Sequence, residues 1–198
     1  MIRRLVLMAV LAAMPLAACS RRQPPPEPQP TAPDTAGEGA RRAAELERMR
    51  QDSIARANAA ADADARRRAD EATARARAIL EEMVHFDYDE SDLRADAQET
   101  LGRKIPILRS NPDVRLRIVG HADERGSVEY NLALGMRRAN AVREYLAGFG
   151  VDASRFETTS MGEDRPIASG SNEQAWAQNR RAEFVITAGD TPLTLPGS

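Results

Sequence analysis

The stretch that decides the fold is residues 114–147, with the sequence VRLRIVGHADERGSVEYNLALGMRRANAVREYLA. Apolar residues alternate with arginines over 114–118, a pattern that predicts a half-buried strand. Residues 120–126 begin and end with glycine and predict a loop. Residues 127–147 predict a helix, which ends where Gly148 follows. The stretch therefore predicts a strand, a polar loop and a helix in succession.

The sequence on either side predicts shorter elements of both kinds. In chain order, we expect a strand at 84–88, a helix from an N-cap at Ser91 to Asn111-Pro112, a strand at 156–161, a helix at 173–179 and a strand at 182–186. Pro106 predicts a kink in the first of these helices, and Trp176 is expected in the core. The alternation predicts an α+β domain at residues 84–188, in which a small mixed sheet of about four strands packs against two main helices.

One charged residue falls on the apolar side of the predicted helix 127–147. At 100° per residue, Arg138 shares a stripe with four core-type side chains, those of Leu134, Ala141, Val142 and Tyr145. A guanidinium in that position needs a partner. It is either a structural arginine, in a buried salt bridge or reaching past the sheet edge, or a receptor for an anion, because arginine binds carboxylates through a two-pronged fork.

Asp123 is the natural companion of Arg138. It lies in the loop that leads from the predicted strand into the arginine's helix, and loops at strand ends often carry ligand-binding groups. Asp123 offers an acceptor for an ammonium group and Arg138 offers a donor for a carboxylate. Together they match the zwitterionic end of an amino acid, although the two side chains could also pair with each other.

Composition excludes several classes of protein. Among 198 residues, 28 basic and 30 acidic side chains give a net charge of −2, which argues against a nucleic-acid binder. The single cysteine excludes an internal disulfide and a cysteine-based zinc site. His85 and His121 lack metal-ligand spacing, even with Asp123 and Glu124 nearby, so we expect no metal and no other cofactor. Catalytic motifs such as GxSxG and HExxH are absent, so no enzyme is predicted.

The N-terminus has the pattern of an export signal. A start with two arginines is followed by an apolar run at 5–13, too short to span a bilayer, and then by small residues. The sequence before Cys19 resembles the bacterial lipobox, in which the cysteine becomes the lipid-carrying N-terminus. We therefore expect a signal peptide at 1–18, a lipid anchor, palmitate included, on Cys19, and a proline-rich linker over 19–39.

A segment of different character, residues 40–83, joins the linker to the predicted domain. It is dominated by alanine and arginine and contains no proline or glycine, which predicts a helix. Large apolar residues are too scarce for a globular core, so we expect a long exposed helical stalk. The simplest interpretation is a solvated spacer, and the alternative is a weak coiled coil or a partner-binding helix. At the other end, residues 189–198 are expected to form a flexible tail.

Three short motifs carry a resemblance to a known family. GHADERG at 120–126, YN at 130–131 and RRANAV at 137–142 closely resemble the OmpA-like peptidoglycan-binding domain. Supporting matches are Phe86-Asp87, RSNP at 109–112, SMGE at 160–163 and NRR at 179–181. The resemblance covers residues 84–187 and implies a two-layer OmpA-like domain.

The resemblance also implies a ligand and a set of residues that hold it. By the family pattern, Asp123 takes the ammonium and Arg138 the carboxylate at the free end of meso-diaminopimelate, in the stem peptide of peptidoglycan. By the same pattern, Asn131 and Leu134 line the pocket. The backbone amides of Phe86 and Asp87 help to hold the ligand, and Arg125 reaches further along the peptide.

Location and partners are implied in the same way. Ser20, rather than an aspartate, follows Cys19, and this favours a lipid anchor in the outer membrane facing the periplasm. The lipoproteins of this family imply TolB as the protein partner and a role in envelope integrity and constriction during division. The alternative function is that of an OmpA-like lipoprotein serving mainly as a protein-interaction subunit of another envelope machine.

Overall fold

The computed structural model describes residues 35–189 and 192–196. The predicted signal peptide, Cys19 and most of the predicted linker lie outside the described residues. The chain divides into two compact units, Met1–Gln51 and Asp52–Ser198. Among the helices that the structure describes, none has an apolar stretch long enough to cross a membrane.

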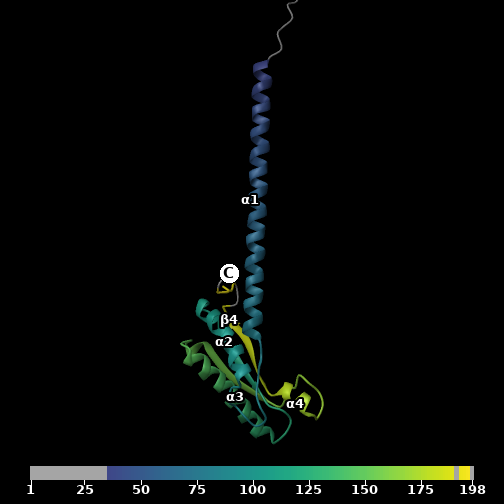
Figure 1. Ribbon diagram of the computed structural model, residues 1–198, viewed down its shortest axis with the longest axis vertical. Helices are drawn as coiled ribbons and strands as arrows, with labels where there is room; N and C mark the ends of the chain where they lie inside the picture. The colour runs from purple at the N-terminus through teal and green to yellow at the C-terminus, as the bar shows by residue number, and fades with distance from the viewer. Residues whose placement is uncertain (1–34, 190–191, 197–198) are drawn as a thin grey trace, which may run out of the picture. The chain divides into compact units, whose positions relative to one another are not determined.

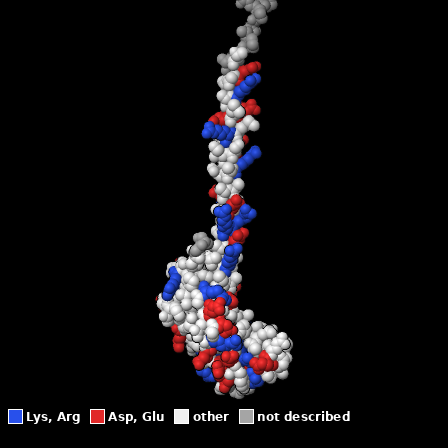
Figure 2. Space-filling model, in the orientation of Figure 1, with Lys and Arg blue, Asp and Glu red and all other residues white. Residues whose placement is uncertain are grey.

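Helix α1 spans Thr35–Glu81, and its side chains are exposed along most of its length. The expected long exposed helix is therefore confirmed. It begins before residue 40, so the prediction of a linker up to residue 39 is wrong for 35–39. Acidic and basic side chains are interspersed on this helix (Figure 2), which suits a surface that faces water.

The last turns of α1 differ from the rest of the helix because they join the core of the second unit. The side chains of Ala76 and Leu80 are fully buried. The Lys104 ammonium caps this end of the helix, donating hydrogen bonds to the carbonyls of Ile79, Leu80 and Glu82 at 2.6, 3.0 and 2.6 Å. The expected domain boundary at residue 84 therefore lies too far along the chain.

The described part of the C-terminal segment packs in the same region. Leu193 is only 3% exposed, and its backbone N–H donates to the Thr73 hydroxyl at 3.2 Å. The Asn111 side chain exchanges two hydrogen bonds with the backbone of Thr194, each 2.8 Å long. The expectation of a flexible tail is thus wrong for residues 192–196, because a buried leucine and backbone hydrogen bonds hold them.

The second unit contains a four-stranded mixed sheet in the order β1-β4-β2-β3. Figure 1 shows its strand β4 together with the helices α2, α3 and α4. The strands are β1 (Val84–His85), β2 (Arg115–His121), β3 (Phe156–Gly162) and β4 (Arg181–Ala188). β2 pairs parallel to β3, and the other neighbours are antiparallel. The parallel pair is joined through helix α3 (Val128–Gly148), a βαβ unit.

The helices of this unit complete a two-layer α+β fold, as predicted. They are α2 (Ala95–Ser110), α3, the 3-10 turn η1 (Ala153–Arg155) and α4 (Glu173–Asn179). The core lies between the sheet and the helices α2 and α3, and includes Leu101, Ile118 and Val142. α3 begins at the N-cap Ser127, whose hydroxyl accepts from the backbone N–H of Tyr130 at 3.2 Å.

Two boundary predictions near the first strand are wrong. β1 holds two residues and does not extend to residue 88, and α2 starts at Ala95 after Arg94, not after Ser91. The physical reason lies in the backbone carbonyls of Phe86, Asp87 and Glu90. These accept hydrogen bonds from arginine side chains, so they are not available to extend the strand.

A contact between two glycines sets the distance between α3 and the sheet. A Cβ on Gly120 of β2 would lie 1.8 Å from the Gly135 carbonyl oxygen, and a Cβ on Gly135 would lie 2.8 Å from the Gly120 oxygen. The helix and the strand therefore touch backbone to backbone. Three residues further along the chain from each glycine stand Asp123, in the loop after β2, and Arg138, in α3, so this contact brings the two predicted ligand residues close.

Candidate functional site

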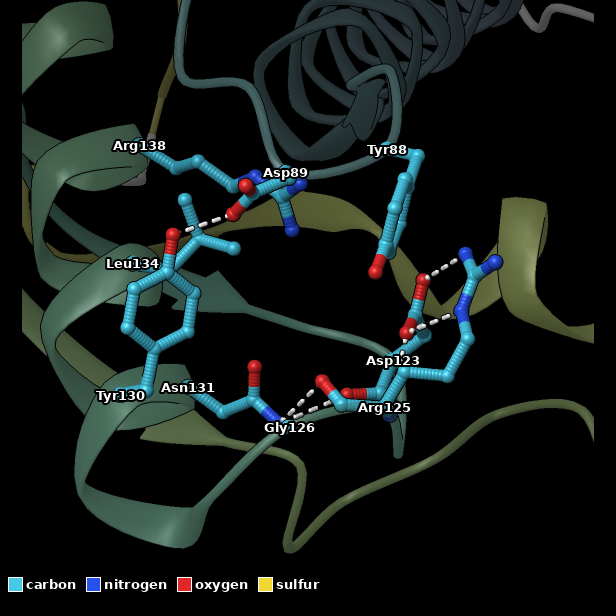
Figure 3. Close-up of a pocket in the computed structure, with 9 residues that line it drawn as sticks. All are labelled: Tyr88, Asp89, Asp123, Arg125, Gly126, Tyr130, Asn131, Leu134 and Arg138. Atoms are coloured by element: carbon cyan, nitrogen blue, oxygen red, sulfur yellow. Dashed lines mark hydrogen bonds and ion pairs between the residues drawn. The ribbon is translucent and has the colours of Figure 1, made fainter.

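A small cavity opens where the loop after β1, the loop after β2 and the start of α3 meet (Figure 3). It is lined by nine residues, Tyr88, Asp89, Asp123, Arg125, Gly126, Tyr130, Asn131, Leu134 and Arg138, and its volume is about 80 Å³. A single water needs roughly 10–15 Å³ on the same measure, so the cavity has room for a charged end group of a few atoms.

Arg138 stands at one wall of the cavity, projecting from α3 (Figure 3). The residue is fully buried, and three N–H groups of its guanidinium donate to the backbone carbonyls of Glu90 at 2.8 Å, His121 at 2.7 Å and Asp87 at 2.9 Å. Burial, with the nearby Arg180, lowers the pKa of Arg138 to about 10, so the guanidinium stays charged at neutral pH. Its predicted place on the buried side of the helix is confirmed.

These contacts differ from the buried salt bridge that the sequence left open for Arg138, and the receptor interpretation stays a prediction. Among the described residues no carboxylate lies within ion-pair distance of it, so it is not held by a buried salt bridge. Backbone carbonyls of two loops hold the side chain instead. A guanidinium has five N–H groups, so two remain for a ligand.

Asp123 lines the opposite wall and does not pair with Arg138 (Figure 3). Its carboxylate, 4% exposed, accepts from the Arg125 backbone N–H at 3.1 Å and from the Arg125 side chain at 3.0 and 2.7 Å. Arg180 donates to the same carboxylate at 3.3 Å. Burial alone would raise the pKa of Asp123, but the hydrogen bonds from Arg125 and Arg180 outweigh it and hold that pKa below its ordinary value.

Two aromatic rings lie against the Arg125 guanidinium. Its guanidinium lies 3.8 Å from the centre of the Tyr88 ring and 4.1 Å from that of Trp176. The Trp176 indole N–H donates to the Glu124 carboxylate at 3.1 Å, and the ring is only partly buried. The prediction that Trp176 lies in the core is therefore wrong, because its ring is partly exposed and lies against Arg125 instead.

Asn131 fixes the loop that carries Asp123. Its side-chain N–H₂ donates to the backbone carbonyls of Asp123 at 3.0 Å and Arg125 at 3.2 Å, and to the carboxylate of Glu163. Asn131 is 1% exposed and comes from the first turns of α3. The helix α3 therefore positions both charged walls of the cavity. It carries Arg138 itself, and its Asn131 holds the loop that carries Asp123.

Five of the seven ligand residues expected from the sequence line this cavity: Asp123, Arg125, Asn131, Leu134 and Arg138. The other two, Phe86 and Asp87, do not. The Phe86 backbone N–H donates to the Arg180 carbonyl at 3.0 Å, and the Phe86 side chain is buried 5.1 Å from the Arg138 guanidinium. Asp87 acts through its carbonyl on Arg138, and its carboxylate pairs with Arg94 at 3.1 Å.

The sequence reasoning missed four lining residues, Tyr88, Asp89, Gly126 and Tyr130, and the Asp123 partner Arg180. Tyr88 and Asp89 directly follow the expected pair Phe86-Asp87. Asp89 has φ of 57°, a left-handed conformation that marks a turn and ends any strand there. The Tyr130 hydroxyl donates to the Asp89 carboxylate, which joins α3 to this turn. The NRR motif was a signal for Arg180, but it pointed to no role.

The two histidines, His85 and His121, lie on different strands. The His121 side chain is buried beside Glu183, 3.6 Å from its carboxylate, and His85 is in β1. Within the described ranges, no group of three or more His, Cys, Asp and Glu side chains is arranged to hold a metal ion.

Comparison with known proteins identifies the family. Residues 85–180 match the OmpA family. The peptidoglycan-associated lipoproteins of Agrobacterium fabrum and Brucella melitensis are each 49% identical over 105 residues, which are 53% of this chain and 59% and 62% of theirs. The chain thus spans about three fifths of the length of these curated relatives.

A solved structure gives the same result over more of its length. The crystal structure of the peptidoglycan-associated lipoprotein from Burkholderia pseudomallei is 43% identical, with a TM-score of 0.51, and the match covers 52% of this chain and 88% of that one. The chain therefore belongs to the OmpA family and groups there with the peptidoglycan-associated lipoproteins.

Proposed function

We propose that this protein binds peptidoglycan without covalent attachment, by gripping the free zwitterionic end of meso-diaminopimelate in the stem peptide. Asp123 takes the ammonium and Arg138 takes the carboxylate. The observation that carries the proposal is that these two opposite charges line one cavity from opposite walls. The names of the related lipoproteins, which describe them as peptidoglycan-associated, support it.

The chemistry of the cavity suits an end group that bears both charges. A guanidinium with two remaining N–H groups matches a carboxylate, and a neighbouring carboxylate matches an ammonium. The small volume selects the tip of a side chain, so the sugar strands would remain outside. This is a binding function: no bond is made or broken, and many weakly bound copies hold a wall firmly through avidity.

A change in the ligand tests the proposal without altering the protein. We expect the full-length chain to sediment with purified sacculi that contain meso-diaminopimelate. Binding should fall at least about tenfold when that carboxylate is amidated, because Arg138 then loses a charge-assisted fork. Sacculi with lysine in place of diaminopimelate lack the carboxylate and should behave in the same way. Equal binding to all three walls would show that the cavity is not the binding site.

Variants provide the complementary test. Asp123→Ala should abolish sedimentation with the sacculi, and Arg138→Lys should weaken it, because lysine keeps the charge but cannot form the fork. Arg117→Ala is the matched control, since it removes an exposed arginine that bonds Glu157 at 2.9 Å and does not line the cavity. Circular dichroism should confirm that each variant is folded. Undiminished binding by Asp123→Ala would refute the assignment.

The anchor of the proposed function lies in residues that the structure does not describe. We propose that the signal at 1–18 is removed, that Cys19 carries lipid in the outer membrane, and that α1 serves as the spacer on the periplasmic side. Replacing Cys19 with serine should move the protein from the membrane fraction to the soluble fraction in cells. Retention of the Cys19→Ser variant in the outer membrane would refute the lipid anchor.

TolB is the proposed protein partner, within a Tol-Pal system that acts in cell division and envelope integrity. A row of exposed apolar side chains on α3, Val128, Leu132 and Met136, offers a surface next to the cavity. The same row favours the second candidate function, that of an interaction subunit in another envelope machine. Leu132→Asp should abolish capture of purified TolB while sacculus binding persists. Unchanged TolB capture by that variant would remove this surface from consideration.

A further inference from the structure

The carboxylate of Asp123 has no acceptor site left in this structure. A carboxylate has about four lone-pair positions. Four donors lie within 3.3 Å of it: the backbone N–H of Arg125, two N–H groups of the Arg125 side chain, and one of Arg180. A ligand ammonium can therefore reach Asp123 only by displacing one of these donors.

The two arginines differ in their freedom to leave. The Arg180 side chain is 6% exposed, and it also donates to the Phe86 carbonyl at 3.0 Å and to the Glu173 carboxylate at 2.7 Å. Its removal would leave the buried Phe86 carbonyl without that donor. The Arg125 side chain is 27% exposed and belongs to a loop at the rim of the cavity. Arg125 is the donor that can be displaced.

Arg125 also has a second carboxylate within reach. One of its terminal nitrogens lies 3.7 Å from the exposed carboxylate of Glu173. Tyr88 and Trp176 lie against the same guanidinium. When an ammonium takes Asp123, the Arg125 guanidinium can keep an ionic partner by shifting toward Glu173.

We propose that Arg125 is an internal competitor that occupies the ammonium position of the cavity until the ligand displaces it. This inference rests on the proposed function and assigns Arg125 a role opposite to a simple ligand contact. It also sets specificity, because displacing a bidentate guanidinium requires a group that carries a positive charge. A diaminopimelate whose amine is acylated, and therefore neutral, cannot make the exchange, so the site selects stem peptides with a free amine.

The experiment measures the affinity of the full-length chain for a soluble stem tripeptide that ends in meso-diaminopimelate, by titration calorimetry. We expect Arg125→Ala to bind roughly tenfold more tightly than wild type, because the ligand then has no ion pair with Asp123 and no ring contacts to break. Arg125→Lys should fall between the two, and the Arg117→Ala control should match wild type. A tripeptide acetylated on the free amine of its diaminopimelate should bind wild type at least about tenfold more weakly than the unmodified tripeptide.

The single tryptophan of the chain supplies an independent signal. In wild type, the departure of the guanidinium from the face of Trp176 should change the indole fluorescence as the tripeptide is added. In Arg125→Ala the tripeptide should bind with little change in fluorescence. A role for Arg125 in folding alone would produce no such difference.

The outcomes separate this inference from the function on which it rests. If wild type fails to bind the tripeptide, the proposed function fails and the inference fails with it. If wild type binds and folded Arg125→Ala binds equally or more weakly, the cavity assignment stands but the competitor role is refuted. Tighter binding by the variant, together with the loss of the tryptophan signal, supports the competitor role.

Discussion

Replacing Gly135 with alanine tests the backbone contact that brings the two walls of the cavity together. Gly102 provides a matched control, because both glycines lie inside helices and a Cβ on Gly102 would meet no atom within 4 Å. Alanine at either position gains helix propensity of about 1 kcal/mol. The two variants therefore differ only in what the added methyl group touches.

The structure sets the size of that difference. A Cβ on Gly135 would lie 2.3 Å from the Ser160 hydroxyl and 2.8 Å from the Gly120 carbonyl oxygen. The hydroxyl can rotate away, but it then loses the hydrogen bond from the Gly162 N–H, which costs about 1 kcal/mol. The carbonyl belongs to β2 and can move only with the strand, at a further 1–3 kcal/mol or so. We expect Gly135→Ala to lose about 2 kcal/mol net, while Gly102→Ala gains about 1 kcal/mol.

Urea unfolding of the full-length chain, followed by circular dichroism, measures both effects as shifts of the transition midpoint. Gly135→Ala should also bind the diaminopimelate tripeptide more weakly, because Arg138 moves with α3. If Gly135→Ala proved as stable as Gly102→Ala, the close approach of helix and strand would not limit packing here, and the explanation of the cavity's geometry would be refuted.

Three further predictions concern stability. Burial lowers the pKa of His121 to about 4 from 6.5, so the unfolded chain takes up a proton before the folded chain does. Stability should fall by up to about 3 kcal/mol as the pH drops from 6.5 to 4, and urea titrations should show a flatter pH profile for His121→Leu. Lys104→Met removes the donor to the carbonyls of Ile79, Leu80 and Glu82 and should cost about 2 kcal/mol, with faster amide exchange at the end of α1. Leu193→Ala should cost 2–3 kcal/mol or so in thermal unfolding, whereas the exposed Leu46→Ala should be nearly neutral.

Much of the second unit follows from local pattern. The alternation in residues 114–118 predicts β2, and the 3.6-residue period of residues 127–147 places Arg138 on the buried side of α3. Such patterns depend on neighbours two to four residues apart, so the sequence alone displays them. Boundaries were less predictable: Ser91 looks like an N-cap, but α2 begins only at Ala95, after Arg94.

The sequence by itself thus determined the order of strands and helices, the buried face of α3 and the identity of the two opposite charges, because these depend on short-range periodicity and on motifs. Only the tertiary structure decided how those charges are used. Arg180 reaches Asp123 across 57 residues of chain, and Arg138 reaches the Asp87 carbonyl across 51. Such pairings depend on how closely the elements pack, which here is set by Gly120 meeting Gly135. Whether a carboxylate such as that of Asp123 already accepts its full set of hydrogen bonds is therefore a property of the packed molecule, since the donors can lie far away along the chain.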